Sequence, residues 1–138
     1  MHNLSALRTP IYTLSLLLLG NFANAAAAAD ARWLGIWQAK DSLFSLRIVT
    51  RDDFLHIEPV ETLGFQWRNS PGRISGDSAS FNVEYQGVLA TVHVQLGEDG
   101  TAIARPVSCR PDYHVVCALV QNQQALFKKI SEPTQNAD

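Results

Sequence analysis

The chain of 138 residues has few charged residues, no basic run and only two cysteines. Charged residues make up 17% of the chain, against the ~25% that is typical of soluble domains, whereas the eight glycines and six prolines are close to average usage. This composition excludes a disordered chain, a collagen and a coiled coil. A formal net charge of −2 without a basic run argues against nucleic acid as a partner.

Sequence signatures of catalysis are also missing. The chain contains no phosphate-binding loop, no dinucleotide fingerprint and no H-E-x-x-H motif. Gly76-Asp77-Ser78 is similar to the first block of a hydrolase family, but these residue types favour turns and the tripeptide lies between two predicted strands. Nothing in the sequence brings together the three histidines that follow the first 25 residues. We therefore expect a protein that is not an enzyme, with no catalytic residue, no metal site and no cofactor.

Residues 1–25 have the features of a secretory signal peptide. Arg8 supplies a positive charge, residues 11–19 are largely apolar, and Ala23-Asn24-Ala25 provides the small residues that a signal peptidase requires. The alanine run that follows allows cleavage at any bond up to residue 29. Because the uninterrupted apolar stretch is well short of the ~20 residues that span a bilayer, we expect cleavage rather than anchoring. The sequence thus predicts a periplasmic or secreted protein.

Cys109 and Cys117 are the two cysteines, and an exported chain meets conditions that oxidise such a pair. Their separation suits a disulfide across a hairpin whose loop is centred on Tyr113. In the chain-entropy model, closing a loop this short contributes about 2.5 kcal/mol. The spacing is not C-x-x-C, and two cysteines do not complete a zinc site, so we interpret the pair as a structural disulfide.

Apolar and polar residues alternate with period two after the signal peptide, and no helical pattern longer than two turns occurs. The sequence predicts an all-β fold, an antiparallel up-and-down meander of eight to ten short strands. We expect the meander to close into a barrel, because closure leaves no free edge. Residues 33–130 would form this single β-barrel domain, and residues 131–138 a flexible tail.

The register is clearest for a hairpin formed by residues 80–86 and 88–96. A two-residue turn at Gln86-Gly87 connects its strands, and Gly87 can adopt the positive φ that such a turn requires. The predicted cross-strand pairs are Tyr85 with Val88, Val83 with Ala90, and Phe81 with Val92. The outward positions of this hairpin are mostly polar, so we expect a barrel that is not embedded in a membrane.

Further predicted turns extend the inner face to the rest of the chain. They lie at Asp52-Asp53, at residues 97–100, which would set Leu96 opposite Thr101, and at residues 122–123. Residues 63–68 are expected to form a strand and residues 69–72 a turn. The additional inward positions predicted in this way are Leu46, Ile48, Leu55, Ile57, Ile103, Arg105, Val107, Cys109, Leu119, Leu126, Lys128 and Ile130.

Arg105 and Trp67 are candidate contacts for a ligand or a partner. Alternation points Arg105 into an apolar face, where a guanidinium needs an acidic partner, a barrel mouth or a negative ligand group. Alternatively, a bulge at Pro106 turns Arg105 outward, and the sequence leaves both arrangements open. Trp67 belongs to a large aromatic set that favours a filled core, namely Trp37, Trp67, Phe44, Phe65, Phe81 and Tyr85.

The two ends of the barrel sequence resemble calycin barrels, which include lipocalins, avidins and bacterial metalloprotease inhibitors. The resemblance rests on Trp33-Leu-Gly35-Ile-Trp37 and on the basic last strand Leu126-Phe-Lys128-Lys129. It implies that Gly35 and Trp37 close one end of the barrel beneath Lys128, in a cation–π contact. The size, the signal peptide and the single disulfide are most similar to the inhibitor branch, although here the disulfide lies late in the chain.

Two functions follow as expectations. The first is an exported binding protein that docks on another exported protein, with a hydrolase as one candidate target. The resemblance to the inhibitor branch implies that residues 26–32 are an inhibitory tail, and a frayed end left by cleavage is the alternative. The second is a carrier of a small apolar ligand inside the barrel, since an eight-stranded barrel can hold one small ligand.

Overall fold

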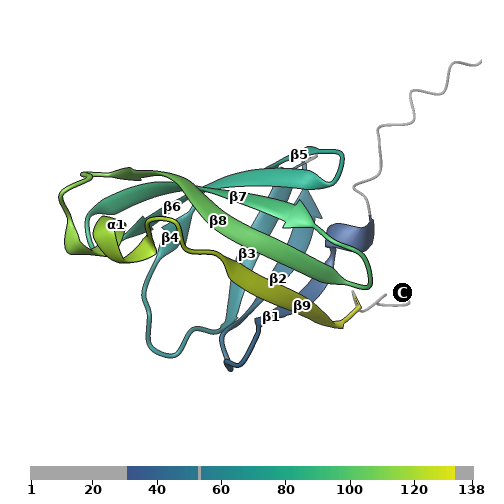
Figure 1. Ribbon diagram of the computed structural model, residues 1–138. Helices are drawn as coiled ribbons and strands as arrows, with labels where there is room; N and C mark the ends of the chain where they lie inside the picture. Colours follow the sequence, from purple (N-terminus) through teal and green to yellow (C-terminus); the bar gives the residue numbers. More distant parts are fainter. Residues whose placement is uncertain (1–30, 53, 133–138) are drawn as a thin grey trace, which may run out of the picture.

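A computed structural model describes residues 31–52 and 54–132 (Figure 1). The predicted signal peptide and residues 133–138 of the predicted tail lie outside the described residues. Ser131, which was expected to begin the tail, is the last residue of a strand. Within the described ranges, no helix has the length and the apolar character needed to cross a membrane.

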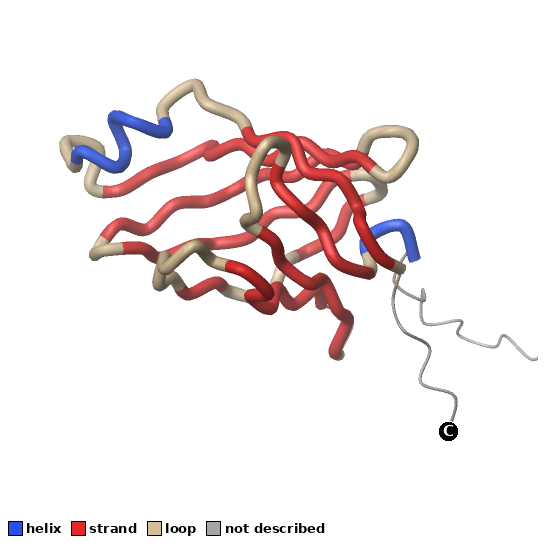
Figure 2. The backbone as a smooth tube through the Cα atoms, turned by 90° about the horizontal axis from the view of Figure 1, so that it is seen from below, coloured by secondary structure: helices blue, strands red, loops and turns tan. Residues whose placement is uncertain are grey.

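The fold is all-β, as the alternation predicts. One antiparallel sheet contains nine strands in the order β3-β2-β1-β9-β8-β7-β6-β4, with β5 also paired to β6. Two short helical segments flank the sheet at opposite ends of the strands (Figure 2). The elements are η1 (Ala31–Trp33), β1 (Gly35–Ala39), β2 (Ser45–Arg51), β3 (Phe54–Glu61), β4 (Arg68–Asn69), β5 (Arg73–Ser75), β6 (Ser78–Tyr85), β7 (Val88–Leu96), β8 (Thr101–Arg110), α1 (Val115–Val120) and β9 (Ala125–Ser131).

The sheet curls into a nearly closed barrel with one seam. β1 and β9 pair along their length, so the two ends of the domain are joined side by side. The seam lies between β3 and the β4–β5 edge, where the described residues form a single bridge between Leu55 and Gly72, with N–H···O distances of 3.1 and 2.7 Å. Gly72 is required there because a Cβ atom would lie 2.1 Å from the ring of Phe81.

Two hairpins form in the predicted register. In β6–β7 the three predicted pairs are all present, and Gln86 and Gly87 both have positive φ, at 49° and 77°, as a tight hairpin turn requires. In β2–β3, Arg51 pairs with Phe54, the two residues that flank the predicted turn at Asp52-Asp53, of which residue 53 lies outside the described residues. The predicted inward positions of that hairpin are buried or packed against the core, namely Leu46, Ile48, Leu55 and Ile57.

The prediction for β7–β8 is wrong by one residue. Leu96 pairs with Ala102 instead of Thr101, because the loop takes up one residue more than expected. Within it, the Gly97 N–H donates to the Thr101 carbonyl oxygen at 2.9 Å. A slip of one residue exchanges the two faces of a strand. Ala102, Ala104 and Pro106 therefore line the interior, whereas the predicted inward residues Ile103, Arg105 and Val107 are exposed.

The disulfide between Cys109 and Cys117 is present, with the Cα atoms 5.5 Å apart, but it does not join two strands. Cys117 lies in α1, a helix of six residues that begins after His114, whose Nδ1 accepts a hydrogen bond from the Val116 N–H at 3.1 Å. Leu119, predicted to face inward, is 70% exposed. The helix is shorter than two turns, so its period could not be recognised in the sequence.

The segment before β6 also differs from the prediction. Residues 62–67 form a loop instead of a strand, because Leu63 and Gly64 both have positive φ, at 53° and 85°, which interrupts extended backbone. Of residues 69–72, which were expected as a turn, Asn69 belongs to β4, and residues 70–72 separate β4 from β5, both of which pair with β6. The predicted turn at Gly76-Asp77 does join β5 to β6, with Gly76 at φ 59°.

Candidate functional site

One end of the barrel is closed by two tryptophans. Trp33 and Trp37 are 0% and 2% exposed, and the Trp37 Nε1 donates a hydrogen bond to the Trp33 carbonyl oxygen at 2.9 Å. The Lys129 Nζ lies 5.4 Å from the centroid of the Trp37 ring and donates to the Ala31 carbonyl oxygen at 3.3 Å. Lys129 thus fixes both the indole and the turn η1 that covers this end.

The structure places Gly35 and Trp37 at this end, but the basic residue is Lys129 and not Lys128. Lys128 is exposed and pairs with Thr101 on the neighbouring strand. Two causes produce the shift of one residue. The helix α1 replaces the strand through which the predicted register was extended, and a bulge between Ile36 and Trp37 offsets β1 against β9. As a result Phe127 and Lys129 lie on the inner side of β9, whereas its exposed residues include Leu126, Lys128 and Ile130.

Gly35 is needed for this closure on steric grounds. Its φ is 126°, a conformation that side chains disfavour, and a Cβ atom would lie 2.3 Å from the Ser131 carbonyl oxygen. The absence of a side chain therefore lets β1 approach β9 closely at the point where the ends of the barrel meet.

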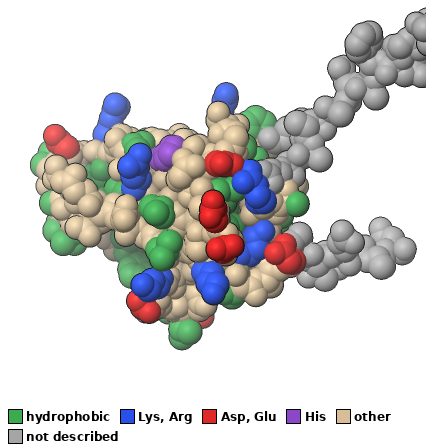
Figure 3. All heavy atoms as spheres, turned by 45° about the vertical axis from the view of Figure 1, so that its right-hand side comes forward, with side chains coloured by type: hydrophobic (Ala, Val, Ile, Leu, Met, Phe, Trp, Pro, Cys, Tyr) green, Lys and Arg blue, Asp and Glu red, His purple; other side chains and the backbone are tan. Residues whose placement is uncertain are grey.

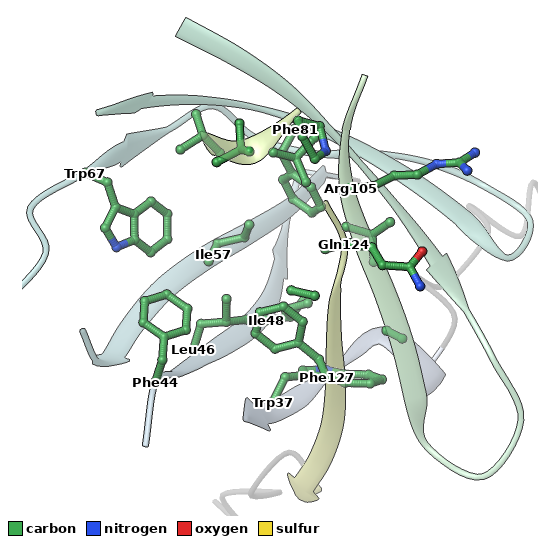
Figure 4. A pocket seen from close by; sticks show the side chains of 18 of the residues that line it. Trp37, Phe44, Leu46, Ile48, Ile57, Trp67, Phe81, Arg105, Gln124 and Phe127 are labelled. Atoms are coloured by element: carbon green, nitrogen blue, oxygen red, sulfur yellow. The ribbon is translucent and has the colours of Figure 1, made fainter. Parts of the chain in front are cut away.

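Above the tryptophans, the barrel contains an apolar cavity of about 470 Å³ (Figure 4). Its walls are formed by inward side chains of the strands and by residues of the loops at the opposite end. The sequence favoured a filled core because of its aromatic content, but these rings line the space and leave it open. The lining includes every tryptophan of the chain and four phenylalanines, namely Trp33, Trp37, Trp67, Phe44, Phe65, Phe81 and Phe127.

Aromatic pairs border the cavity on the side of the loops. Phe44, just before β2, lies 6.4 Å from Trp67 and 6.4 Å from Phe127 between ring centroids. Phe65 lies 5.9 Å from Tyr85 in an edge-to-face arrangement. Figure 4 shows Phe44 and Trp67 beside one another at one side of the cavity. The structure therefore places Trp67, a predicted contact residue, in the cavity wall.

Few polar side chains reach this space. Gln123 and Gln124, between α1 and β9, belong to the lining. The Trp33 Nε1 is buried and has no hydrogen-bond partner among the described residues. The cavity is thus suited to an apolar molecule with few polar atoms.

Arg105 points outward because of the longer loop after Leu96, and not because of a bulge at Pro106. Val92 pairs with Pro106 while Thr91 pairs with Ser108, which places a bulge at Val107. Arg105 is exposed and borders the cavity, but Figure 4 shows its guanidinium directed away from it. The inward position predicted by alternation is therefore wrong, and Arg105 is not brought together with Trp67.

The two ends of the barrel differ in polarity. Around the closed end lies a polar surface hollow, with Arg32 and Asp77 in an ion pair at 2.6 Å. Figure 3 shows acidic and basic side chains gathered on this side of the molecule. The open end is formed by four connections, which are residues 40–44, 62–67, 86–87 and 111–124.

The acidic side chains and histidines of the described residues do not form a metal site. Across residues 31–52 and 54–132, no three histidine, cysteine, aspartate or glutamate side chains gather in a way that would hold a metal ion. Glu58, part of an acidic segment in the sequence, forms ion pairs with Arg47 and Arg51. His114 caps α1.

The fold is compatible with the calycin-like barrel that the sequence resembles, with a Gly-x-Trp closure beneath a lysine of the last strand. Comparison of the chain with protein-family models, with curated proteins and with solved structures gives no significant match.

Proposed function

We propose that the protein is an exported carrier of a small apolar ligand, which it holds inside the barrel. The observation that carries this proposal is the cavity of about 470 Å³, closed at one end by Trp33 and Trp37 and open at the other. Ligand sites are concave, largely apolar and ~300–1,000 Å³ in volume, with a small number of polar groups. The cavity meets each of these criteria.

The lining indicates the kind of ligand. Its apolar body would lie against the aromatic walls, and a polar group at its outer end would lie near Gln123 and Gln124. We therefore expect an uncharged or singly charged molecule with a ring system or a short aliphatic chain.

The hypothesis of an inhibitory tail is less well supported. Of residues 26–32, the described part is held against the barrel, since Arg32 pairs with Asp77 and the Ala31 carbonyl oxygen accepts from Lys129. Residues 26–30 lie outside the described residues. Docking on a protein stays a prediction, whereas the cavity offers a direct site for a ligand.

The test is a titration of the mature protein with an apolar fluorescent probe such as N-phenyl-1-naphthylamine. Since all three tryptophans line the cavity, binding should quench their emission and enhance that of the probe in a saturable manner. An Ala104→Phe variant places a ring in the space that the probe would occupy and should abolish binding. Ser108→Phe adds the same ring on the exposed face of β8 and is the matched control.

Saturable binding that is lost in Ala104→Phe and kept in Ser108→Phe supports the proposal. A linear response of the native protein, or equal binding by both variants at unchanged circular dichroism, contradicts it.

A further inference from the structure

The open end of the barrel carries exposed apolar side chains around the entrance of the cavity. We name this group the apolar rim, and it comes from three connections that are distant in sequence. Each side chain is between 50% and 86% exposed. The rim consists of Leu43, Leu63, Phe65, Tyr113, Val115 and Leu119.

The helix α1 is the most unusual part of the rim. Its sequence, VVCALV, contains no polar residue, although Val115, Ala118 and Leu119 are exposed. A surface helix of a globular protein normally presents a polar face to water, and a helix that is apolar all round is found in an apolar environment. Leu43 and Leu63 lie in residues 40–44 and 62–67, two connections at the same end of the strands as α1. A group of this kind marks an interaction surface.

From this arrangement we propose that the apolar rim docks on the surface of a lipid bilayer, with the cavity entrance facing the lipid. The inference rests on the proposed carrier function, because an apolar ligand is dissolved in the lipid phase and would enter the cavity from it. A protein seated on the rim would cover the entrance instead. The rim is continuous with the cavity through Phe65, which belongs to both.

The charges beside the rim define the kind of lipid surface. Lys40 is followed by Asp41, Arg68 pairs with Glu84 at 2.6 Å, Arg110 is close in sequence to Asp112, and Glu61 accepts a hydrogen bond from the Leu63 N–H at 2.8 Å. These groups thus carry no excess of positive charge that would attract anionic lipid, and anionic lipid is not required. Binding should therefore occur on zwitterionic vesicles, depend on burial of apolar area and respond little to salt.

The experiment is co-sedimentation of the mature protein with phosphatidylcholine vesicles. The rim variant Leu43→Gln/Leu63→Gln/Leu119→Gln changes three exposed leucines that do not line the cavity. The matched control is Leu89→Gln/Val107→Gln/Ile130→Gln, which changes three side chains of similar exposure on the barrel wall. The partition coefficient should fall about tenfold or more in the rim variant and less than about twofold in the control.

Solution binding of the apolar probe, measured in parallel, separates this inference from the proposed function. Native affinity for the probe together with lost vesicle binding in the rim variant supports docking. The inference is overturned if the native protein does not sediment with vesicles, if the rim and control variants partition equally, or if high salt releases the protein. Failure to sediment combined with dimerisation through the rim, measured by analytical ultracentrifugation, would assign the surface to protein contact. If the native protein binds vesicles but does not bind the probe, the carrier function is rejected and docking on the bilayer is retained.

Discussion

The Lys129 ammonium group lies 5.4 Å from the centroid of the Trp37 ring, and it joins the last strand to the first. The lysine side chain is 10% exposed, so the contact is shielded from water. It also holds the backbone of η1 through Ala31. This single side chain connects the three segments that close the barrel.

Replacing Lys129 should therefore destabilise the protein. Lys129→Met removes the cation–π contact and one hydrogen bond, and we expect the free energy of unfolding to fall by about 1–2 kcal/mol. The exposed neighbour Lys128 provides the control, and Lys128→Met should change the free energy of unfolding by less than about 0.5 kcal/mol. Urea denaturation monitored by tryptophan fluorescence measures both, and a larger effect at Lys128 would contradict the structure.

Gly35 offers a second test of the closed end. Gly35→Ala places a Cβ atom against the Ser131 carbonyl oxygen at a strained φ, so we expect a loss of about 3 kcal/mol or more. Gly64 also has positive φ, but no atom lies within 4 Å of the point that a Cβ atom would occupy, and Gly64→Ala should cost only about 1 kcal/mol. Similar midpoints of thermal unfolding for the two variants would show that β1 and β9 are not in close contact.

The disulfide ties α1 to the end of β8. Removing it in Cys109→Ala/Cys117→Ala releases a short loop, for which the chain-entropy model gives a loss of about 2.5 kcal/mol. Because α1 packs beside the cavity through Val120, the affinity for the probe should also decrease. Hydrogen exchange of residues 115–120 would become faster in this variant. Reductant should reproduce the effect in the native protein and have none in the variant.

The two predicted contact residues should behave differently in ligand binding. Trp67→Ala removes part of the cavity wall, and we expect the dissociation constant of the probe to rise about tenfold. Arg105→Gln should change the dissociation constant of the probe by less than about twofold, since the guanidinium points away from the cavity. Fluorescence titration distinguishes them, and a stronger effect at Arg105 would restore the inward alternative.

The sequence could predict those parts of the fold in which a tight turn and an alternating pattern agree. Gly87 favours a tight turn at Gln86-Gly87, and a slip would expose Phe81, so the register of β6–β7 followed from the residues alone. The loop after Leu96 had no such restraint. One additional residue in it reversed the predicted orientation of every side chain from Thr101 to Val107.

The cavity itself could not be predicted from composition. The same aromatic residues can fill a barrel or line it, and the outcome depends on the barrel's width and on where the loops hold Phe44 and Trp67. α1 was missed because six apolar residues between two loops are read as a strand. The Gly-x-Trp motif located the closed end correctly, but the identity of its lysine depended on a bulge that no sequence pattern marks.

The bridge between Leu55 and Gly72 determines how readily the diameter of the barrel can change. Most neighbouring strands are held by ladders of several residue pairs, whereas this line of the wall depends on two hydrogen bonds among the described residues. Each contributes only about 0.5–1.5 kcal/mol net, so parting them is inexpensive compared with separating a full ladder. A bulky ligand could therefore separate the strands along this seam, while the end closed by the two indole rings keeps its shape.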